Sequence, residues 1–436
     1  MKNLKNMKHI LGIILIILAL QVNAQIPVPA GPQTKPIALM NGIVHTGNGT
    51  VIDNGIITID KGKITSIGDA RVVKIDLTGY EVINVSGKHV YPGLILANST
   101  IGLVDINSVR ATRDYQEVGA FTPNVRSAIA YNTDSEVIPT LRFNGILLTQ
   151  VVPTGGIISG TSSVMALDGW NWEDAAYALD GGIHIYWPGY LSSPKWWLGE
   201  TEWKKNEEYE EKTREIEEFL QNSWSYAQQE NPEEVNLKME AMKGLYNGQK
   251  KIFVHADGKR QIIESVSMFK RNGINDIVVV GASNAYYVMD FLKDNNIPVL
   301  LTKVHRLPGF DEEDVDMPFK LPALLTEKGL TVGLIHSGDV QSSRNLAFYA
   351  GTAAAYGLDK EEALKLITSN PAKILGIDKT TGTLEQGKDA NIVVSEGDIL
   401  DMRTNKLEYA FIQGKEVELL GRQQLLYQRY KEKYKQ

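Results

Sequence analysis

Residues 251–301 read KIFVHADGKRQIIESVSMFKRNGINDIVVVGASNAYYVMDFLKDNNIPVLL, and this stretch decides the fold class. Short apolar runs alternate in it with amphipathic segments whose apolar residues have the spacing of helices. Such strand–helix alternation is typical of α/β proteins with a parallel sheet. The repeat returns roughly every 25 residues, which favours a (β/α)8 TIM-like barrel over an open sheet.

Further apolar runs extend this pattern in both directions along the chain. Upstream lie VYPGLILA at residues 90–97 and NGILLTQVV at residues 144–152, and downstream lies LTVGLIHSG at residues 330–338. Together with the helical patterns between them, they predict a barrel that covers residues 92–377. A chain of 436 residues is long for one average domain, so an accessory domain is expected beside the barrel.

The two ends of the chain share a different pattern. Residues 37–85 alternate apolar and polar side chains between Gly, Asp and Asn turns, and residues 382–419 return to the same alternation. This alternation is typical of antiparallel strands with one face in water. We therefore predict one small β-sandwich domain that is assembled from residues 25–91 and residues 378–436.

The first residues have the pattern of a secretory signal peptide. Three lysines precede an apolar run at residues 10–20, and the small residues of VNA end at Ala24. The alternative is a membrane anchor, but this run is too short to span a bilayer. We expect residues 1–24 to be removed and the protein to be exported to a bacterial periplasm or cell surface, which the absence of cysteine also fits. The net charge of −7 argues against a nucleic-acid partner.

A segment rich in tryptophan and glutamate interrupts the regular pattern at about residues 168–250. All seven tryptophans lie between Trp170 and Trp224, and residues 200–235 hold twelve Glu against four Lys or Arg. The acidic run predicts a solvated helix near residues 204–228. Two interpretations of the tryptophans stay open: they line a pocket or lid over the barrel mouth, or they pack a long loop against the barrel.

Polar residues follow several of the predicted strands, which is where a parallel barrel carries its catalytic groups. These strand ends supply Asn98, Ser99 and Thr100, then His255 with Asp257, then Gly281, then His305 with Arg306, and finally His336 with Asp339. They are the candidate site residues of the barrel mouth.

The layout of residues 37–417 resembles the amidohydrolase superfamily of metal-dependent hydrolases, and in particular its imidazolonepropionase-like, exported members. The most specific stretch is EALKLITSNPAKILGIDKTTGTLEQGKDANIVVSEGDIL at residues 362–400. The resemblance implies hydrolysis of a C–N bond in an amide, a cyclic amide or a dipeptide. It also implies one or two divalent metals, held by His-x-His after the first strand, Lys or Glu after the fourth, His after the fifth and sixth, and Asp after the eighth.

The chain departs from this ligand pattern at most positions. Asn98 and Thr100 stand at the His-x-His pair, and Gly281 stands at the histidine of the sixth strand. His255 matches the ligand of the fifth strand, whereas Asp339 matches the eighth only if the loop is shifted by two residues. An amide, a hydroxyl and a glycine do not replace three imidazoles, so we expect the metal site to be degenerate and no cofactor to be bound.

An alternative is a single divalent ion, such as zinc, held by His255, His336 and Asp339. Without a metal, His255 would act as a general base that Asp257 or Asp339 orients. The predicted catalytic residues are therefore His255, Asp257, His336 and Asp339.

Other polar residues have a structural interpretation beside a functional one. Arg110, Arg113 and Asp114 belong either to an anion-binding loop or to an ordinary surface loop with ion pairs. His184 and His305 are isolated in the sequence and are expected to be structural. Residues 153–169 are rich in Gly, Ser and Thr, and they form either a loop whose backbone approaches a ligand or a tight connection.

Two function classes remain open, and so does the question of whether the protein is an enzyme. The first is an exported amidohydrolase-like hydrolase of C–N bonds. The second is a non-catalytic pseudoenzyme, a ligand-binding or scaffold protein whose barrel mouth takes a small-molecule or peptide-like ligand, with the Trp-rich segment stacking on it. Either class is compatible with a homo-oligomer or with pairing to an intact amidohydrolase.

Overall fold

The structure is a computed structural model that describes residues 28–302, 304–308, 313–336 and 338–435. The predicted signal peptide, residues 1–24, lies outside this range. Within the described residues, no helix has the length and apolar character that crossing a membrane requires.

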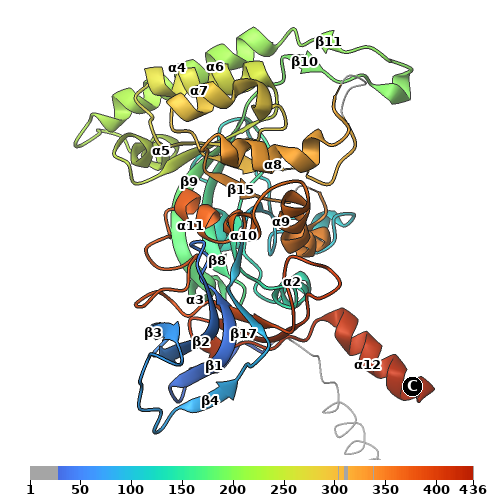
Figure 1. The fold of residues 1–436 in the computed structure, drawn as a ribbon. Coiled ribbons are helices and arrows are strands. Elements are labelled where there is room, and N and C mark those ends of the chain that lie inside the picture. The colour runs from blue at the N-terminus through green and yellow to red at the C-terminus, as the bar shows by residue number, and fades with distance from the viewer. Residues whose placement is uncertain (1–27, 303, 309–312, 337, 436) are drawn as a thin grey trace, which may run out of the picture.

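Eight strands form a nearly closed barrel sheet (Figure 1), which confirms the predicted TIM-like architecture. Their order is β6 (Leu94–Ser99), β7 (Ile146–Val151), β8 (Ile158–Ala166), β9 (Ala176–Tyr186), β12 (Lys251–Ala256), β13 (Ile277–Gly281), β14 (Val299–Leu301) and β15 (Val332–Leu334). The turn at residues 366–367 bridges the seam between β15 and β6. Its carbonyls accept hydrogen bonds from the backbone N–H groups of Leu334, at 2.8 Å, and Ile95, at 2.9 Å.

One strand departs from the all-parallel barrel that the sequence predicts. β8 runs antiparallel to both β7 and β9, while the other neighbouring pairs of the barrel sheet are parallel. The connection from β7 to β8 is a short turn in which Gly155 and Gly156 have φ angles of 87° and 66°. A turn of this length has no room for a crossover helix, so the next strand must reverse direction.

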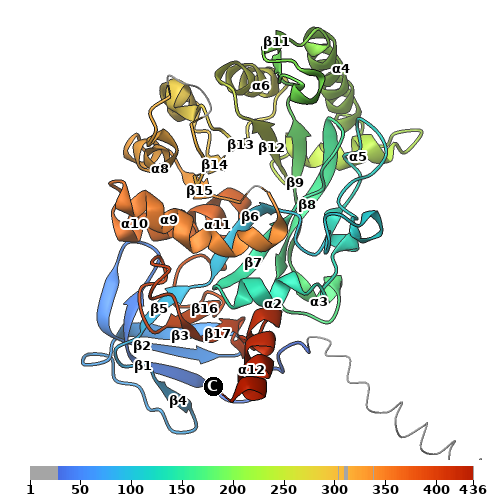
Figure 2. The same ribbon diagram turned by 90° about the vertical axis from the view of Figure 1, so that its right-hand side faces the viewer.

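Helices cover the outside of the barrel. They include α2 (Val137–Arg142), α4 (Tyr209–Ala227), α5 (Leu237–Tyr246), α6 (Lys259–Arg271), α7 (Met289–Asp294), α8 (Met317–Glu327), α9 (Leu346–Ala355), α10 (Lys360–Lys365) and α11 (Ser369–Leu375). α4 lies within the range predicted for the acidic helix, and it buries a stripe that includes Ile216 and Leu220 while its glutamates face solvent. In Figure 2, α9, α10 and α11 lie beside β6 and β15.

The two ends of the chain meet in one connected sheet at the opposite end of the molecule from α4, α6 and α7 (Figure 1). It contains β1 (Ile37–His45), β2 (Val51–Asp60), β3 (Lys63–Asp69), β4 (Glu81–Asn84), β5 (His89–Pro92), β16 (Ile392–Ser395), β17 (Leu407–Ile412) and β18 (Lys415–Glu416). β5 pairs with β1 on one side and with β16 on the other, so it joins the N-terminal and C-terminal strands. The last helix, α12 (Arg422–Tyr434), follows this sheet.

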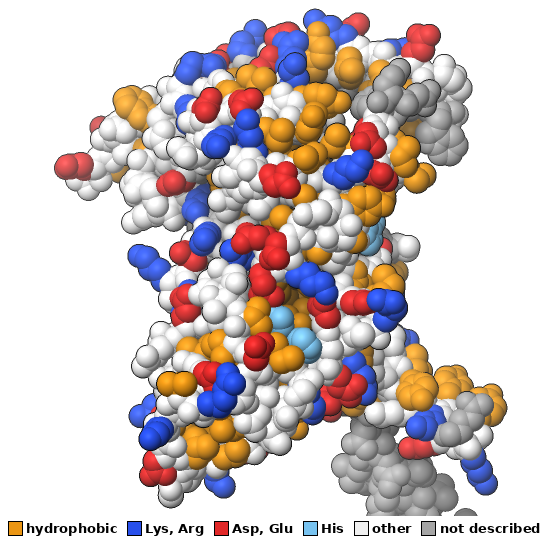
Figure 3. Space-filling model, viewed as in Figure 1, with side chains coloured by type: hydrophobic (Ala, Val, Ile, Leu, Met, Phe, Trp, Pro, Cys, Tyr) orange, Lys and Arg blue, Asp and Glu red, His pale blue; other side chains and the backbone are white. Residues whose placement is uncertain are grey.

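The barrel interior is packed with apolar side chains. Seven buried residues from the barrel strands and the segments that close it form one cluster: Ala97, Phe253, Val278, Val280, Leu300, Ile335 and Ile374. This cluster is the floor on which the polar residues nearer the strand ends lie. On the outer face shown in Figure 3, acidic and basic side chains are interspersed, and hydrophobic side chains gather over the end that carries α7 and α8.

Candidate functional site

A chain of polar side chains crosses the barrel interior above the apolar floor. Five consecutive strands of the sheet, β6, β7, β8, β9 and β12, each contribute one member: Asn98, Gln150, Ser162, His184 and His255. We name these five residues the polar chain. Ser162, His184 and Gln150 are at most 2% exposed, so their hydrogen bonds must be made within the protein.

Gln150 and Ser162 connect the first half of the polar chain. The Gln150 side-chain carbonyl accepts a hydrogen bond from the backbone N–H of Asn98 at 3.0 Å, and its amide group donates to Ser162 Oγ at 3.0 Å. Asn98 has a positive φ of 50°, a conformation that asparagine tolerates better than most residues. Its own Oδ1 is buried and has no hydrogen-bond partner in the described part of the chain.

Two histidines form the second half of the polar chain. His184 Nε2 lies 2.9 Å from Ser162 Oγ, and His184 Nδ1 lies 3.0 Å from His255 Nε2. The His184 ring stacks on Phe253, with ring centroids 4.7 Å apart, and the His255 ring stacks on Tyr186 at 3.9 Å. A hydrogen bond between two imidazole nitrogens joins an N–H donor to an unprotonated acceptor. Two neutral rings meet this requirement, because each carries one N–H group and one unprotonated nitrogen.

Burial keeps these two histidines uncharged. Desolvation, followed by the repulsion of His255, holds the pKa of His184 well below its usual value. Desolvation also lowers the pKa of His255 to about 3, although the nearby Asp257 carboxylate opposes the shift. The polar chain therefore carries no net charge at neutral pH.

The lowered pKa of His255 predicts a loss of stability in mild acid. Its folded pKa of about 3 lies below the value of about 6.5 that an exposed histidine has in the unfolded chain. Between these values the unfolded state binds a proton that the native state does not, so the free energy of unfolding falls as the pH drops below about 6.5. We expect the slope to approach about 1.4 kcal/mol per pH unit for each such histidine as the pH falls from about 6.5 to about 5, measured by urea unfolding.

The matched variant is His255→Asn, which removes one of these titrating groups. Its stability is expected to depend on pH less steeply than that of the wild type, by about one proton. Equal slopes for the two proteins would contradict the assignment of a neutral, buried His255.

The predicted catalytic residues divide into two pairs on different parts of the barrel. His255 and Asp257 lie on and after β12, whereas His336 and Asp339 follow β15, with β13 and β14 between the two pairs. Asp257 accepts hydrogen bonds from the Ser283 hydroxyl at 2.6 Å and from the Ser283 backbone N–H at 3.2 Å. Gly281 leaves room for this arrangement, because a Cβ at that position would lie 3.0 Å from Asp257 Oδ1.

The second pair is also engaged in local contacts. His336 Nδ1 lies 2.7 Å from the Tyr349 hydroxyl, while His336 Nε2 is buried and has no hydrogen-bond partner among the described residues. Asp339 accepts hydrogen bonds from the backbone N–H of Ser342 at 2.9 Å and from its hydroxyl at 2.7 Å. These bonds, led by the hydroxyl, lower the pKa of Asp339 and cap the 3-10 helix η5 (Val340–Asn345).

A cavity of about 510 Å³ lies at the mouth of the barrel, beside the ends of β12 and β13. We name it the mouth pocket; its lining includes Tyr190, Trp203, Asp257, Arg260, Ser283 and Arg306. The Arg260 guanidinium lies 4.0 Å from the centre of the Tyr190 ring, a cation–π contact.

The tryptophan-rich segment takes both of the roles that its sequence left open. Trp203 is 54% exposed and lines the mouth pocket, as expected for a lid, whereas Trp187 is 5% exposed and packs in the core. Trp203 lies just before β11 (Lys204–Lys205), which pairs with β10 (Leu191–Ser192) in a hairpin at the edge of the molecule.

The arginine-rich loop after β6 forms a cavity of its own. Arg110 and Arg113 line a space of about 450 Å³ together with Tyr115, Gln116 and Glu117. The Glu117 carboxylate shares this cavity with the two guanidinium groups, which weakens the interpretation of the loop as an anion site.

Sequence reasoning missed three members of the polar chain: Gln150, Ser162 and His184. His184 was expected to be an isolated structural histidine, but it lies against His255. The sequence offered no clear signal for His184, because its place between Ile183 and Ile185 fits a strand with one face in water as well as a strand that is buried on both faces. Within the described residues, no group of three or more His, Asp or Glu side chains is arranged to hold a metal ion.

Comparison with known proteins confirms the resemblance to the amidohydrolase superfamily. Residues 317–417 match the model of the amidohydrolase family. An amidohydrolase from Thermotoga maritima has the same fold, with a TM-score of 0.74 and 24% identity over 88% of this chain and 99% of that one. No curated protein matches the sequence.

More distant structures share the fold as well. A Xaa-Pro dipeptidase with bound methionine has a TM-score of 0.53 and 15% identity, over 88% of this chain and 100% of that one. An adenosine deaminase from Xanthomonas campestris with bound zinc has a TM-score of 0.52 and 13% identity, over 94% of this chain and 99% of that one. At these identities the likeness concerns the fold, which many different activities share.

Proposed function

We propose that this amidohydrolase-fold protein binds a small amide- or peptide-like ligand in its mouth pocket and has lost the two-metal centre of its superfamily. The observation that carries the proposal is the hydrogen bond between His184 and His255. It engages Nε2, one of the two ring nitrogens of His255, the one residue that matches a superfamily metal ligand. The proposal includes export to a periplasm or cell surface, which rests on the leader-like pattern of residues 1–24.

The side chains at the ligand positions do not fit two divalent metals. Asn98 and Thr100 offer neutral oxygens, and Gly281 offers no donor at all. A larger side chain at Gly281 would meet Asp257, and the φ of 100° there disfavours any other residue. Divalent zinc in proteins is held by imidazole, thiolate or carboxylate groups, which this set lacks.

The mouth pocket has the character of a ligand site. Its volume of about 510 Å³ falls within the range of small-molecule pockets. The ring of Trp203 supplies a flat apolar surface beside Tyr190, whose ring carries the Arg260 guanidinium. Ser283 and Asn284 supply uncharged polar groups just beyond β13. This combination suits a ligand with a planar amide, because the amide can both stack on rings and form hydrogen bonds.

A second candidate function is metal-free hydrolysis of a C–N bond. The observation that favours it is His336 Nε2, which is buried and has no hydrogen-bond partner among the described residues. Desolvation lowers the pKa of His336, and the Asp339 carboxylate opposes this shift. A histidine of this kind is available to take a proton from water. His255 is less suited to this role, because a base whose pKa is about 3 takes up a proton weakly at neutral pH.

One experiment separates the two functions. Purified full chain is screened against N-acyl amino acid amides and dipeptides, and thermal stabilisation and product release are both recorded. We expect stabilisation without turnover, since ligand binding to the native state raises the unfolding temperature. Turnover that is abolished in a His336→Asn variant would instead establish the hydrolase, and the absence of both signals would contradict the proposal.

A matched pair of tryptophan variants locates the binding. Trp203→Ala is expected to weaken the best ligand about tenfold, because it removes a ring from the mouth pocket. Trp170→Ala is the control, since Trp170 is 68% exposed and does not line this pocket. Equal affinities for the two variants would place the ligand elsewhere.

A further inference from the structure

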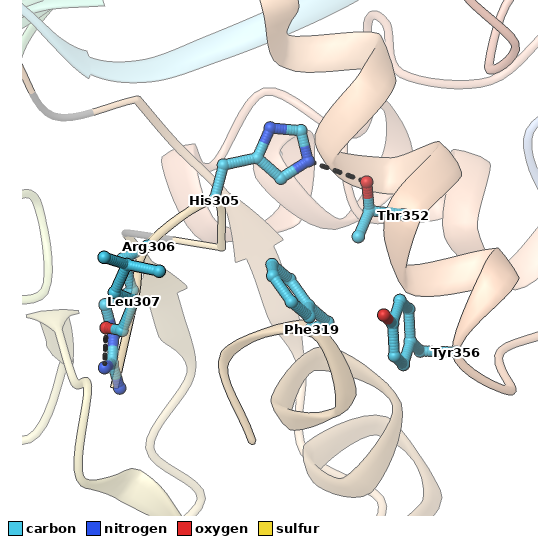
Figure 4. Close-up of a pocket in the computed structure, with 6 residues that line it drawn as sticks. All are labelled: His305, Arg306, Leu307, Phe319, Thr352 and Tyr356. Atoms are coloured by element: carbon cyan, nitrogen blue, oxygen red, sulfur yellow. Dashed lines mark hydrogen bonds between the residues drawn. The ribbon is translucent and has the colours of Figure 1, made fainter. Parts of the chain in front are cut away.

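A second cavity lies beside the mouth pocket, between the segment that follows β14 and the helices α8 and α9. Its volume is about 500 Å³, and we name it the side pocket. It is lined by His305, Arg306, Leu307, Phe319, Thr352 and Tyr356 (Figure 4). Figure 4 shows the rings of Phe319 and Tyr356 next to each other beneath the His305 ring, with Arg306 and Leu307 on the other side.

The walls of the side pocket are mainly aromatic and aliphatic. The ring centroids of Phe319 and Tyr356 are 5.1 Å apart, with the planes tilted by 39°. Leu307 is 85% exposed and Tyr356 is 39% exposed, so solvent reaches apolar surface on both sides of the cavity. Exposed apolar walls that face each other gain free energy when an apolar group fills the space between them.

The polar groups of the side pocket carry no unbalanced charge. The Thr352 hydroxyl donates to the Phe348 carbonyl at 2.9 Å, so its oxygen accepts the hydrogen bond from His305 Nε2–H at 2.7 Å. Desolvation lowers the pKa of His305, which favours the neutral imidazole. The Arg306 guanidinium forms an ion pair with Glu313. A charged ligand would find no counter-ion here, whereas an uncharged ring would meet matching surfaces.

The two cavities share a wall. Arg306 and Leu307 line both the side pocket and the mouth pocket. A ligand whose amide lies in the mouth pocket can therefore extend past Leu307 into the side pocket without leaving the protein surface.

We propose that the side pocket binds an uncharged aromatic ring carried by the ligand of the mouth pocket, which makes the protein selective for aromatic amides or aromatic dipeptides. This selectivity rests on the proposed function, because it assumes that the amide lies in the mouth pocket. The binding of a ring by the side pocket does not depend on that assumption and can be tested alone.

The test uses isothermal titration calorimetry on the full chain with three probes. These are 4-methylphenol, which presents the ring alone, N-acetyl-L-tyrosinamide, which joins the ring to amides, and N-acetyl-L-leucinamide, which lacks the ring. We expect 4-methylphenol to bind and N-acetyl-L-tyrosinamide to bind more tightly than either of the other two. Leu307→Ala and Tyr356→Ala should each weaken 4-methylphenol about tenfold.

The control variants separate the side pocket from general effects. Tyr427→Ala removes a tyrosine that is 65% exposed on α12, and it should leave all affinities unchanged. Tyr356→Phe keeps the ring and should keep the affinity for 4-methylphenol. Both pocket variants alter exposed side chains, so each is expected to fold.

The outcomes distinguish this inference from the proposed function. The proposal that the side pocket binds a ring is wrong if 4-methylphenol does not bind. It is also wrong if Leu307→Ala and Tyr356→Ala leave the affinity for 4-methylphenol unchanged. If 4-methylphenol binds there but N-acetyl-L-tyrosinamide binds no more tightly than 4-methylphenol does, ring binding by the side pocket is confirmed. The proposed binding of an amide in the mouth pocket is then contradicted.

Discussion

Replacing His184 with alanine is expected to lower the free energy of unfolding by about 3–5 kcal/mol. The His184 side chain is 0% exposed and its ring stacks on Phe253. Its removal leaves a cavity in the barrel interior, and it also takes a hydrogen-bond partner from Ser162 and from His255. Each buried polar group that loses its partner costs about 1–3 kcal/mol, in addition to the cost of the cavity.

A second variant at the same position separates these two causes. His184→Phe refills the space with a ring but restores no hydrogen bond. Ser162 keeps its hydrogen bond from Gln150, so the main loss is that of the His255 partner, and we expect a loss of only about 1–3 kcal/mol. His305→Ala serves as the control, because the His305 side chain is more exposed and loses one hydrogen bond, to Thr352, so we expect a change of about 1 kcal/mol. Urea unfolding measures the free energy of unfolding of all three variants. A His184→Ala loss as small as that of the control would show that the polar chain does not hold the barrel interior together.

Much of the fold could be predicted from the sequence, because its signals are local. From β12 onward the barrel strands are short, largely buried apolar runs, and a helix with an amphipathic pattern follows β12, as α6 shows. One sheet domain built from both ends of the chain was likewise expected from their shared alternation, and the pairing of β5 with β16 joins the two ends. The direction of β8 could not be predicted in the same way. A strand pattern has the same period whether the strand runs parallel or antiparallel to its neighbours.

The site was harder to predict than the fold. The rule that catalytic groups follow barrel strands selects His255 and His336 as candidates, since it depends only on position in the sequence. The rule could not find Gln150 or His184, because these lie inside strands whose two faces are both buried. Along such strands the sequence does not show which residues point into the barrel. The contact between His184 and His255 therefore required the register of β9 against β12.

The loss of the metal centre is the central claim, and zinc content tests it most directly. Purified full chain is incubated with excess zinc chloride, desalted and analysed for zinc. We expect it to retain fewer than about 0.1 zinc ions per chain, because Asn98, Thr100 and Gly281 supply no strong ligand. The adenosine deaminase from Xanthomonas campestris, whose crystal structure contains zinc, is treated in the same way as a positive control.

Anomalous diffraction from crystals grown with zinc gives the position of any ion that remains. We expect no anomalous peak beside the polar chain and a zinc content near zero. Two zinc ions per chain, with anomalous peaks beside Asn98 and His255, would contradict the loss of the metal centre.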